Sequence, residues 1–265
     1  MSLKEKSAVW WIIAINLLVY ILFIFYPSAV NYFAITANSI LNGQYIWTLL
    51  THMFSHALFF HLFVNMFSLW FVGRFVERII GRRRFWIFYL AAGLFAGAVS
   101  VLGAGYFGYG IGERIFGSPS IPMLGASGAI FGLVGVLAVL VPYSRVYLIA
   151  GPLIAILAGA VVSSFVSSEA VMSFVYILIN IYVLVSIFLM FSFNPSKRKI
   201  ILPIEMPFWL LPIVAIVPLM IIGLFVFLPI GNIAHLAGLI AGLVYGFYLR
   251  TKYKRKVMLL QRHFR

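Results

Sequence analysis

The sequence contains no cysteine and no aspartate, and charged residues make up only 9% of its 265 positions. The absence of cysteine excludes disulfide scaffolds, thiolate metal sites and cysteine nucleophiles. The absence of aspartate excludes the paired aspartates of an aspartyl intramembrane protease. The acids that remain leave no obvious carboxylate for a catalytic triad. They are Glu5, Glu77, Glu113, Glu169 and Glu205.

The shortage of charge accompanies an excess of apolar residues. Hydrophobic residues make up 64% of the chain and the mean hydropathy is +1.12, so the charges are too few to coat a water-soluble globule. A bilayer core of about 30 Å needs about 20 apolar residues per helix, and eight stretches approach that length. They are residues 8–26, 57–76, 85–104, 127–142, 146–166, 170–193, 207–229 and 232–249. The sequence therefore predicts an all-α polytopic membrane protein with about eight spans.

The basic residues indicate how these spans are oriented. A net charge of +14 is compatible with nucleic-acid binding, but eighteen of the nineteen basic residues fall on one side of the membrane if both termini are cytoplasmic. The positive-inside rule predicts this distribution for an even number of spans. We therefore expect an integral protein of the cell membrane with cytoplasmic termini and no nucleic-acid partner. The basic tail, residues 251–265, is interpreted as a topology anchor, with weak binding of anionic lipid as the alternative.

Polar side chains inside apolar spans are costly, which makes them candidates for function. Ser127 begins the fourth stretch after a loop rich in glycine and proline, and His235 lies in the first turn of the last stretch. Both first turns face outward and so lie at similar depth. A histidine within hydrogen-bond reach could take the serine proton as a general base. On these residues alone, an N-cap serine and a packing histidine remain alternatives.

Glycines offer the two helices a way to meet, because faces of small residues let membrane helices approach closely. These glycines are Gly128, Gly132 and Gly135 in the fourth stretch and Gly238, Gly242 and Gly246 in the last. Phe131 follows Ser127 by one turn and so points toward the same neighbour. Its ring could stack on His235, although an ordinary packing role is equally compatible with the sequence.

His61 and Asn65 are four residues apart and therefore face the same way on the second helix. Their side chains could donate hydrogen bonds to a developing oxyanion, beside the backbone N–H of Ser127. A metal site is the competing interpretation, because His52 and His56 are also four apart, but no His-Glu-x-x-His motif and no nearby acid accompany them. We expect no metal and no organic cofactor, and interpret His56 as a hydrogen-bonding strut near the membrane surface.

In combination, these motifs resemble those of the rhomboid family. The shared patterns are His56-x4-His61-x3-Asn65, Gly125-Ala126-Ser127-Gly128 and His235-x2-Gly238-x3-Gly242, in the same order and in corresponding spans. The resemblance implies that Ser127 is the nucleophile and His235 the general base. It also implies that His61 and Asn65 donate to the oxyanion. The residues expected to support this site are His56, Gly125, Gly128, Phe131, Gly238 and Gly242.

The resemblance further implies a six-helix bundle with a water-filled cavity open to the outside. It covers residues 1–148 and 200–250, while residues 149–199 are expected to form an inserted transmembrane hairpin. An even number of extra spans returns the chain to the same side and preserves the orientation of the site. The family often has Trp-Arg in the loop after the first helix, where this chain has Trp47 and Thr48; this departure concerns the loop contacts and not the dyad.

The function expected from the resemblance is intramembrane serine proteolysis, with transmembrane proteins in the lipid bilayer as substrates. An alternative is a non-catalytic rhomboid-like protein that binds client transmembrane helices. Loss of the serine or the histidine would favour that alternative, and this chain retains both. A transporter or channel is a third possibility, but it would need polar residues along a whole pathway across the membrane. The polar cluster here lies near one face only.

Overall fold

The computed structural model describes residues 7–163, 165–190, 199–224 and 231–264. In these residues five helices are long and apolar enough to cross a membrane, and three shorter apolar helices accompany them. The long helices are Ala8–Phe25, Phe59–Ile80, Arg82–Phe107, Glu169–Leu189 and Asn232–Lys252, and the shorter ones are Ser127–Leu140, Ala150–Ser163 and Phe208–Gly223. Each corresponds to one predicted stretch, which confirms the polytopic all-α membrane fold. The ends of two predicted stretches, residues 191–193 and 225–229, lie outside the described residues.

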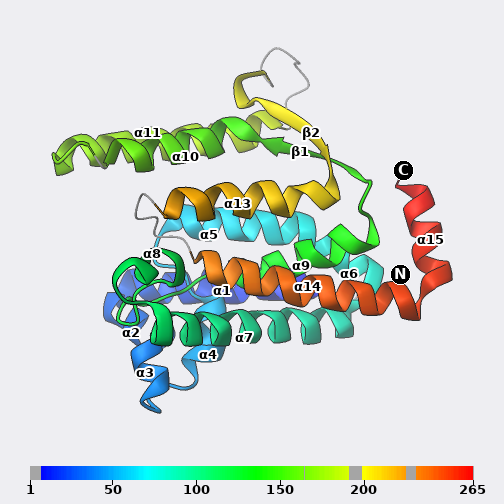
Figure 1. Cartoon of the computed structure of the whole chain (residues 1–265), viewed down its shortest axis with the longest axis horizontal. Coiled ribbons are helices and arrows are strands. Elements are labelled where there is room, and N and C mark those ends of the chain that lie inside the picture. Colours follow the sequence, from blue (N-terminus) through cyan, green and yellow to red (C-terminus); the bar gives the residue numbers. More distant parts are fainter. Residues whose placement is uncertain (1–6, 164, 191–198, 225–230, 265) are drawn as a thin grey trace.

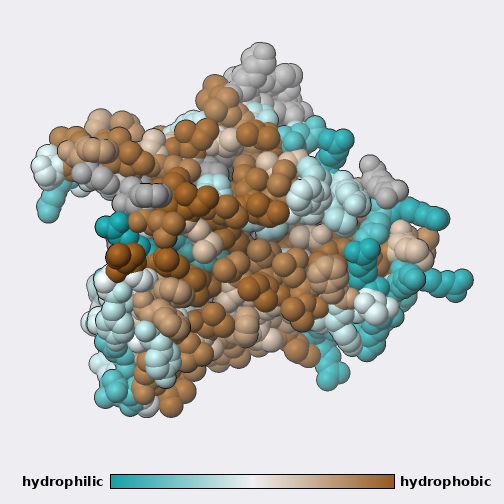
Figure 2. All heavy atoms as spheres, viewed as in Figure 1, coloured by the Kyte–Doolittle hydropathy of each residue, from teal (hydrophilic) through white to brown (hydrophobic). Residues whose placement is uncertain are grey.

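The surface of the molecule matches this assignment. Figure 2 shows hydrophobic side chains across the middle of one face and hydrophilic side chains gathered toward its ends. Such a band is the surface that a hydrocarbon core covers. The protein is therefore an integral membrane protein, with its helices crossing the hydrophobic layer.

The first membrane helix, α1 (Ala8–Phe25), is followed by short helices at one end of the bundle (Figure 1). They are α2 (Val30–Phe33), α3 (Ala37–Leu41) and α4 (Thr48–Thr51), with 3₁₀ turns at Pro27–Ala29 and His52–Phe54. Ile35 and Met123 exchange two backbone hydrogen bonds of 2.9 and 2.8 Å. These short helices are thereby tied to the loop that leads into the fourth predicted stretch.

The second and third predicted stretches are joined by a tight reversal of the chain. The first member runs through α5 (Phe59–Ser68), a π-helical turn (Leu69–Gly73) and α6 (Arg74–Ile80). The chain then reverses at Gly81, whose φ of +84° favours glycine, and continues as α7 (Arg82–Phe107). A short helix, α8 (Glu113–Phe116), lies in the connection to the next span.

The centre of the bundle is α9 (Ser127–Leu140), in which twelve of fourteen residues are buried. Helix α14 (Asn232–Lys252) packs against it so closely that backbones touch. A Cβ added to Gly238 would lie 1.9 Å from the carbonyl oxygen of Gly128. One added to Gly242 would lie 2.0 Å from that of Gly132. Only glycine permits this approach, and it fixes the relative height of the two helices.

The structure corrects the predicted stretch 146–166, which is not helical throughout. Residues Arg145–Ile149 form strand β1, which pairs antiparallel with β2 (Pro203–Pro207), and helix α10 begins only at Ala150. β-branched and aromatic residues in this segment suit an extended chain, and an apolar run alone does not distinguish a strand from a helix. The two strands form a β ribbon, across which Nη1 of Arg145 lies 3.4 Å from Oε1 of Glu205.

The ribbon carries α10 (Ala150–Ser163) and α11 (Glu169–Met190), which lie side by side beyond the rest of the bundle (Figure 1). Residues 164 and 191–198, within the expected hairpin at 149–199, lie outside the described residues. After β2 the chain enters α13 (Leu211–Gly223) through a 3₁₀ turn (Phe208–Leu210). The six remaining membrane helices are α1, α5 with α6, α7, α9, α13 and α14, which form the expected bundle.

The basic tail contains a further helix, α15 (Lys254–His263), that the hydropathy of the tail does not predict. Val257 on this helix is buried, and Leu260 packs against the core of the bundle. The ring of Phe264 meets that of Phe75 edge to face at 5.1 Å. The tail is therefore docked on the bundle over most of its length.

Candidate active site

The chain turns sharply just before α9. Gly125 has a φ of +131°, a conformation that side chains with a Cβ rarely adopt, and its N–H donates to the carbonyl of His52 at 2.9 Å. The next N–H, that of Ala126, points at Nε2 of His56 at 3.4 Å. Ser127 then begins the helix. The loop is thus held by the segment between α4 and α5, which fixes where the serine emerges.

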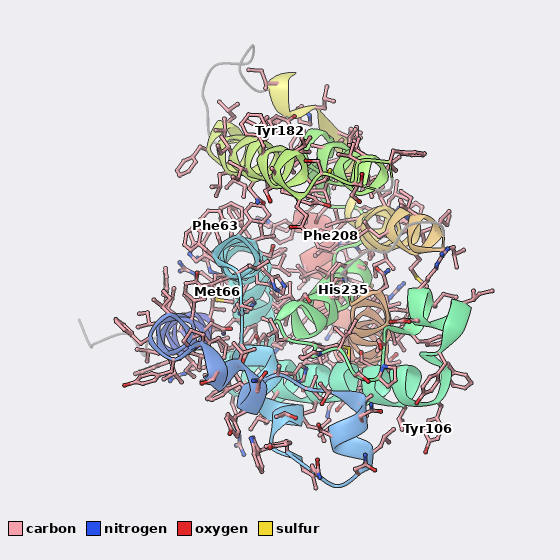
Figure 3. All side chains as sticks on the ribbon, turned by 90° about the vertical axis from the view of Figure 1, so that its left-hand side faces the viewer. Phe63, Met66, Tyr106, Tyr182, Phe208 and His235 are labelled. Atoms are coloured by element: carbon pink, nitrogen blue, oxygen red, sulfur yellow. The ribbon has the colours of Figure 1, made fainter. Side chains whose placement is uncertain are left out.

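Ser127 and His235 are brought together from positions 108 residues apart. Nε2 of His235 lies 2.8 Å from the hydroxyl oxygen of Ser127, which is hydrogen-bonding distance. The ring of Phe131, one turn along α9, stacks on the imidazole at 4.5 Å between centroids and 23° between planes. Figure 3 shows His235 toward the middle of the bundle and not on its rim. The glycine contacts between α9 and α14 hold the serine and the histidine at the same level.

His61 also reaches this place. A Cβ built on Gly125 would lie 2.8 Å from Cε1 and 3.0 Å from Nε2 of His61, and 3.8 Å from the Ser127 hydroxyl. The imidazole of His61 therefore occupies the space beside Gly125, next to the serine. It meets the ring of His56 edge to face at 4.8 Å between centroids.

Asn65 is buried on the same helix, but its amide is directed along that helix. The side-chain nitrogen donates to the carbonyl of His61 at 2.9 Å. An amide nitrogen carries two hydrogens, so one remains for another acceptor. The structure thus places the His61 ring next to the serine. The hydrogen bond from Asn65 to the His61 carbonyl uses one of the two amide hydrogens of Asn65.

His52 and His56 do not lie together as a ligand pair. Nδ1 of His52 lies 2.9 Å from the carbonyl oxygen of Thr48, and its ring packs against Gly97. His56 instead faces His61 and the backbone of Ala126. Among the described residues, no three histidine or acidic side chains gather in a geometry that could hold a metal ion.

The loop at Trp47 and Thr48 makes its own contacts. The indole N–H of Trp47 donates to the carbonyl of Tyr32 at 2.9 Å, and the Thr48 hydroxyl donates to the carbonyl of Tyr45 at 2.7 Å. The segment is therefore tied to the short helices beside it.

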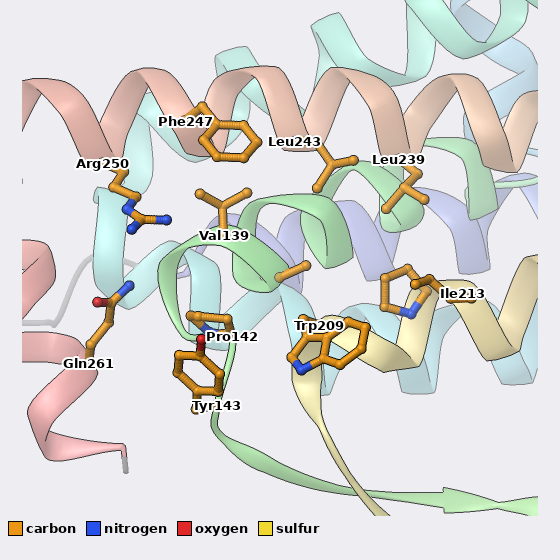
Figure 4. Close-up of a pocket in the computed structure, with 12 residues that line it drawn as sticks. Val139, Pro142, Tyr143, Trp209, Ile213, Leu239, Leu243, Phe247, Arg250 and Gln261 are labelled. Atoms are coloured by element: carbon orange, nitrogen blue, oxygen red, sulfur yellow. The ribbon is translucent and has the colours of Figure 1, made fainter.

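The structure also contains a cavity away from the dyad. A cavity of about 350 Å³ lies at the other end of α9 and α14, between these helices, α13 and α15 (Figure 4). Ser127 and His235 are not among its lining residues. On α14 the lining of the cavity begins at Leu239, one turn after His235, and continues to Arg250, so the cavity extends away from the dyad along the same pair of helices.

Curated proteins similar to this chain carry rhomboid names. The chain is 37% identical over 105 residues to rhomboid protease GluP of Bacillus subtilis (strain 168), covering 40% of this chain and 18% of that protein. It is 30% identical over 122 residues to the human presenilin-associated rhomboid-like protein, mitochondrial, covering 46% and 29%. It is 32% identical over 90 residues to the inactive RHOMBOID-like protein 8 of Arabidopsis thaliana, covering 34% and 22%.

The chain spans less than a third of the length of each of these relatives. A family model described as the rhomboid domain matches residues 43–181, which is more than half of the chain. The matched segment includes the histidine-rich turn, α5 and the serine loop. This chain belongs to the rhomboid family.

Proposed function

We propose that this protein is an intramembrane serine protease that hydrolyses peptide bonds in or near transmembrane helices of other membrane proteins. The observation that carries the proposal is the 2.8 Å separation of the Ser127 hydroxyl and His235 Nε2 at the start of a buried helix. A serine with a histidine base in reach is an activated nucleophile without any third residue. Its position in an apolar bundle suits a substrate that is itself in the membrane.

In this proposal His235 Nε2 accepts the hydroxyl proton as Ser127 Oγ attacks the carbonyl carbon of the scissile peptide. His235 then gives the proton to the leaving amine, the C–N bond breaks, and the acyl group stays on Ser127. A water molecule, deprotonated by His235, attacks the acyl carbon; the ester C–O bond then breaks and His235 returns the proton to Ser127 Oγ. The products are a carboxylic acid and the free serine hydroxyl. Phe131 limits the orientations of the imidazole during both transfers.

The oxyanion of the tetrahedral intermediate needs donors on the other side of the carbonyl. The first N–H groups of a helix have no partner within it and carry a partial positive charge, so the start of α9 favours a negative oxygen. We assign His61, beside Gly125, as a side-chain donor, and Asn65 as a second. In other hydrolases, one such hydrogen-bond donor stabilises the transition state by about 3 to 4 kcal/mol.

The substrate must be unwound at the bond that is cut, because an intact helix keeps its carbonyl oxygens in hydrogen bonds. Segments with small or helix-breaking residues unwind most readily. With both termini cytoplasmic, the dyad faces the outer side of the cell membrane, where water can enter. No metal or organic cofactor takes part.

The test uses purified protein with a single-span fluorescent substrate and, separately, a fluorophosphonate that labels activated serines. We expect the wild type to cleave and to be labelled. Ser127→Ala and His235→Ala should each lower cleavage at least about 10³-fold, since removal of either member disables the other. Ser28→Ala and His263→Ala, which change an exposed serine and histidine away from the site, should retain activity.

The same experiment separates catalysis from binding alone. A non-catalytic rhomboid-like protein would retain the single-span substrate in a pull-down, would not cleave it, and would not react with the fluorophosphonate. Equal cleavage by the wild type and both dyad variants would remove Ser127 and His235 from the reaction.

A further inference from the structure

The cavity at the far end of α9 and α14 has a polar end and an apolar end. Figure 4 shows Arg250 and Gln261 at one end, and Leu239 with Ile213 at the other. The walls between them are apolar side chains, three of which stay about half exposed: Phe247 at 54%, Ile213 at 46% and Trp209 at 44%. The cavity is thus a cleft whose apolar walls are accessible from the surface.

The apolar wall on α14 has the length of one leaflet. Leu239, Leu243, Phe247 and Arg250 follow one another at helical spacing along a single face. Leu239 and Arg250 are eleven residues apart, which is about 16 Å along the helix. Half of a hydrocarbon core of about 30 Å is about 15 Å. An acyl chain lying along this face would therefore end near mid-membrane, with its headgroup at Arg250.

The charge at the polar end has no counterpart in the walls. Arg250 is the one charged residue that lines the cleft, and the sequence contains no acid after Glu205. Glu205 faces Arg145 across the ribbon at 3.4 Å. Glu77, on α6, accepts hydrogen bonds from the Ser7 hydroxyl and from the Ala8 N–H, the latter at 2.7 Å. Among the residues that the structure describes, no acid lines the cleft beside Arg250, so its charge is available to an anionic ligand.

Helix α15 adds further positive charge beside the opening. It contributes Gln261 to the cleft while Val257 fixes the helix on the bundle. Its exposed basic residues are Lys254, Arg255, Lys256 and Arg262. Trp209 also lines the cleft, between Pro142 and Ile213 (Figure 4).

From this geometry we propose that the cleft between α9, α13 and α14 is a binding site for one anionic phospholipid, with an acyl chain along Leu239, Leu243 and Phe247 and its phosphate on Arg250. The site lies in the leaflet opposite Ser127, because α14 carries His235 at its start and Arg250 about 22 Å further along. The proposal does not depend on the protein being a protease, and its test measures no proteolysis.

The test is native mass spectrometry of the full-length protein in detergent, titrated with phosphatidylglycerol or with phosphatidylcholine of identical chains. We expect the wild type to retain one phosphatidylglycerol in preference to phosphatidylcholine. Arg250→Ala should weaken phosphatidylglycerol binding about fivefold, the effect of one basic contact of about 1 kcal/mol. Leu243→Trp, which fills the cleft, should weaken the binding of both lipids. Thermal melting of each variant without added lipid verifies that it is folded.

Two controls decide whether the site is specific. Lys256→Ala removes an exposed charge of α15 that does not line the cleft, and should leave the affinity unchanged. Glycerol 1-phosphate, which has the headgroup chemistry without chains, should not displace the lipid. An equal loss in Arg250→Ala and Lys256→Ala would mean diffuse attraction by the tail and would overturn the proposal. Displacement by glycerol 1-phosphate would also overturn it, because the chain would then contribute nothing.

Discussion

At the residue scale, the polar groups around Ser127 have distinguishable tasks. The serine and histidine share a hydrogen bond, Phe131 lies against the imidazole, and His56 supports the loop through the N–H of Ala126. The Asn65 side chain donates a hydrogen bond to the carbonyl of His61 on the same helix. A structural role and a role at the oxyanion predict different kinetics for its removal.

Asn65→Ala separates these two roles. If the second hydrogen of the amide binds the oxyanion, the substitution should lower kcat about 10²-fold and leave KM nearly unchanged, because the contact exists only in the transition state. Steady-state kinetics with the fluorescent substrate measure this. Asn16→Ala is a matched control: Asn16 is buried on α1 and donates to the carbonyl of Ile12 at 2.8 Å, the same backbone bond away from Ser127. If both variants lose the same small factor, Asn65 has no part in the reaction.

The sequence predicted the side chains of this site better than the backbone that holds them. The predicted span boundaries put Ser127 and His235 in the first turns of their helices. The four-residue spacing put His61 with Asn65 on one helical face, since helical periodicity determines which side chains share a face. The contact of the Gly125 N–H with the His52 carbonyl had no signature. Any residue type supplies a carbonyl, so the tertiary structure alone reveals it. Glycine at 125 indicated a turn at that position, but not the carbonyl that its N–H contacts.

At the scale of elements, the pairing of α9 with α14 decides whether the dyad exists. The sequence predicted the glycine faces from spacings of three and four residues, and the backbone contacts at Gly238 and Gly242 follow from them. The sequence did not predict strand β1, because an apolar run beside a basic residue is equally typical of a membrane helix. Its partner β2 lies more than fifty residues further along, so the strand is set by a long-range contact.

Gly242→Ala tests the dependence of the dyad on this packing. The added methyl group would lie 2.0 Å from the Gly132 carbonyl oxygen, so α14 must move away from α9. We expect a loss of about 1 to 3 kcal/mol in stability, seen as a lower Tm in detergent, together with lower kcat as the serine and histidine separate. Val244→Leu, on the same helix but 66% exposed, should change neither quantity. Full activity and unchanged Tm in Gly242→Ala would mean that the helices tolerate a wider spacing.

At the scale of the whole molecule, the open question is how the chain crosses the membrane between β1 and β2. Helix α10 has fourteen residues, or about 21 Å, which is shorter than a hydrocarbon core of about 30 Å. Helix α11 has twenty-two residues and is long enough. If α10 and α11 both cross, the chain returns to the side it left, and the ribbon joins two segments on that side. If α10 does not cross, everything after α11 is inverted relative to Ser127.

The geometry of the site excludes crossing by α11 alone, so if α11 crosses, as its length allows, α10 must cross too. Inversion would have to turn α14 as well, yet His235 at its start meets Ser127 at the start of α9, so these two helices must run in the same direction. The basic residues agree, since Arg145 and Lys199 flank the segment and the positive-inside rule assigns both to the cytoplasm. A short span is tolerated if the bilayer thins around it, at a fraction of a kcal/mol per ångström.

We therefore predict that topology reporters fused after Arg145 and after Lys199 both give a cytoplasmic signal. A reporter fused after Val166, between α10 and α11, should give an external signal. Paired phosphatase and fluorescent-protein fusions measure each position in cells. A cytoplasmic signal at all three positions would mean that neither helix crosses and that the insertion lies on the inner surface. An external signal after Lys199 would contradict the shared direction of α9 and α14, because the segment leading into α13 would then start on the wrong side for His235 to reach Ser127.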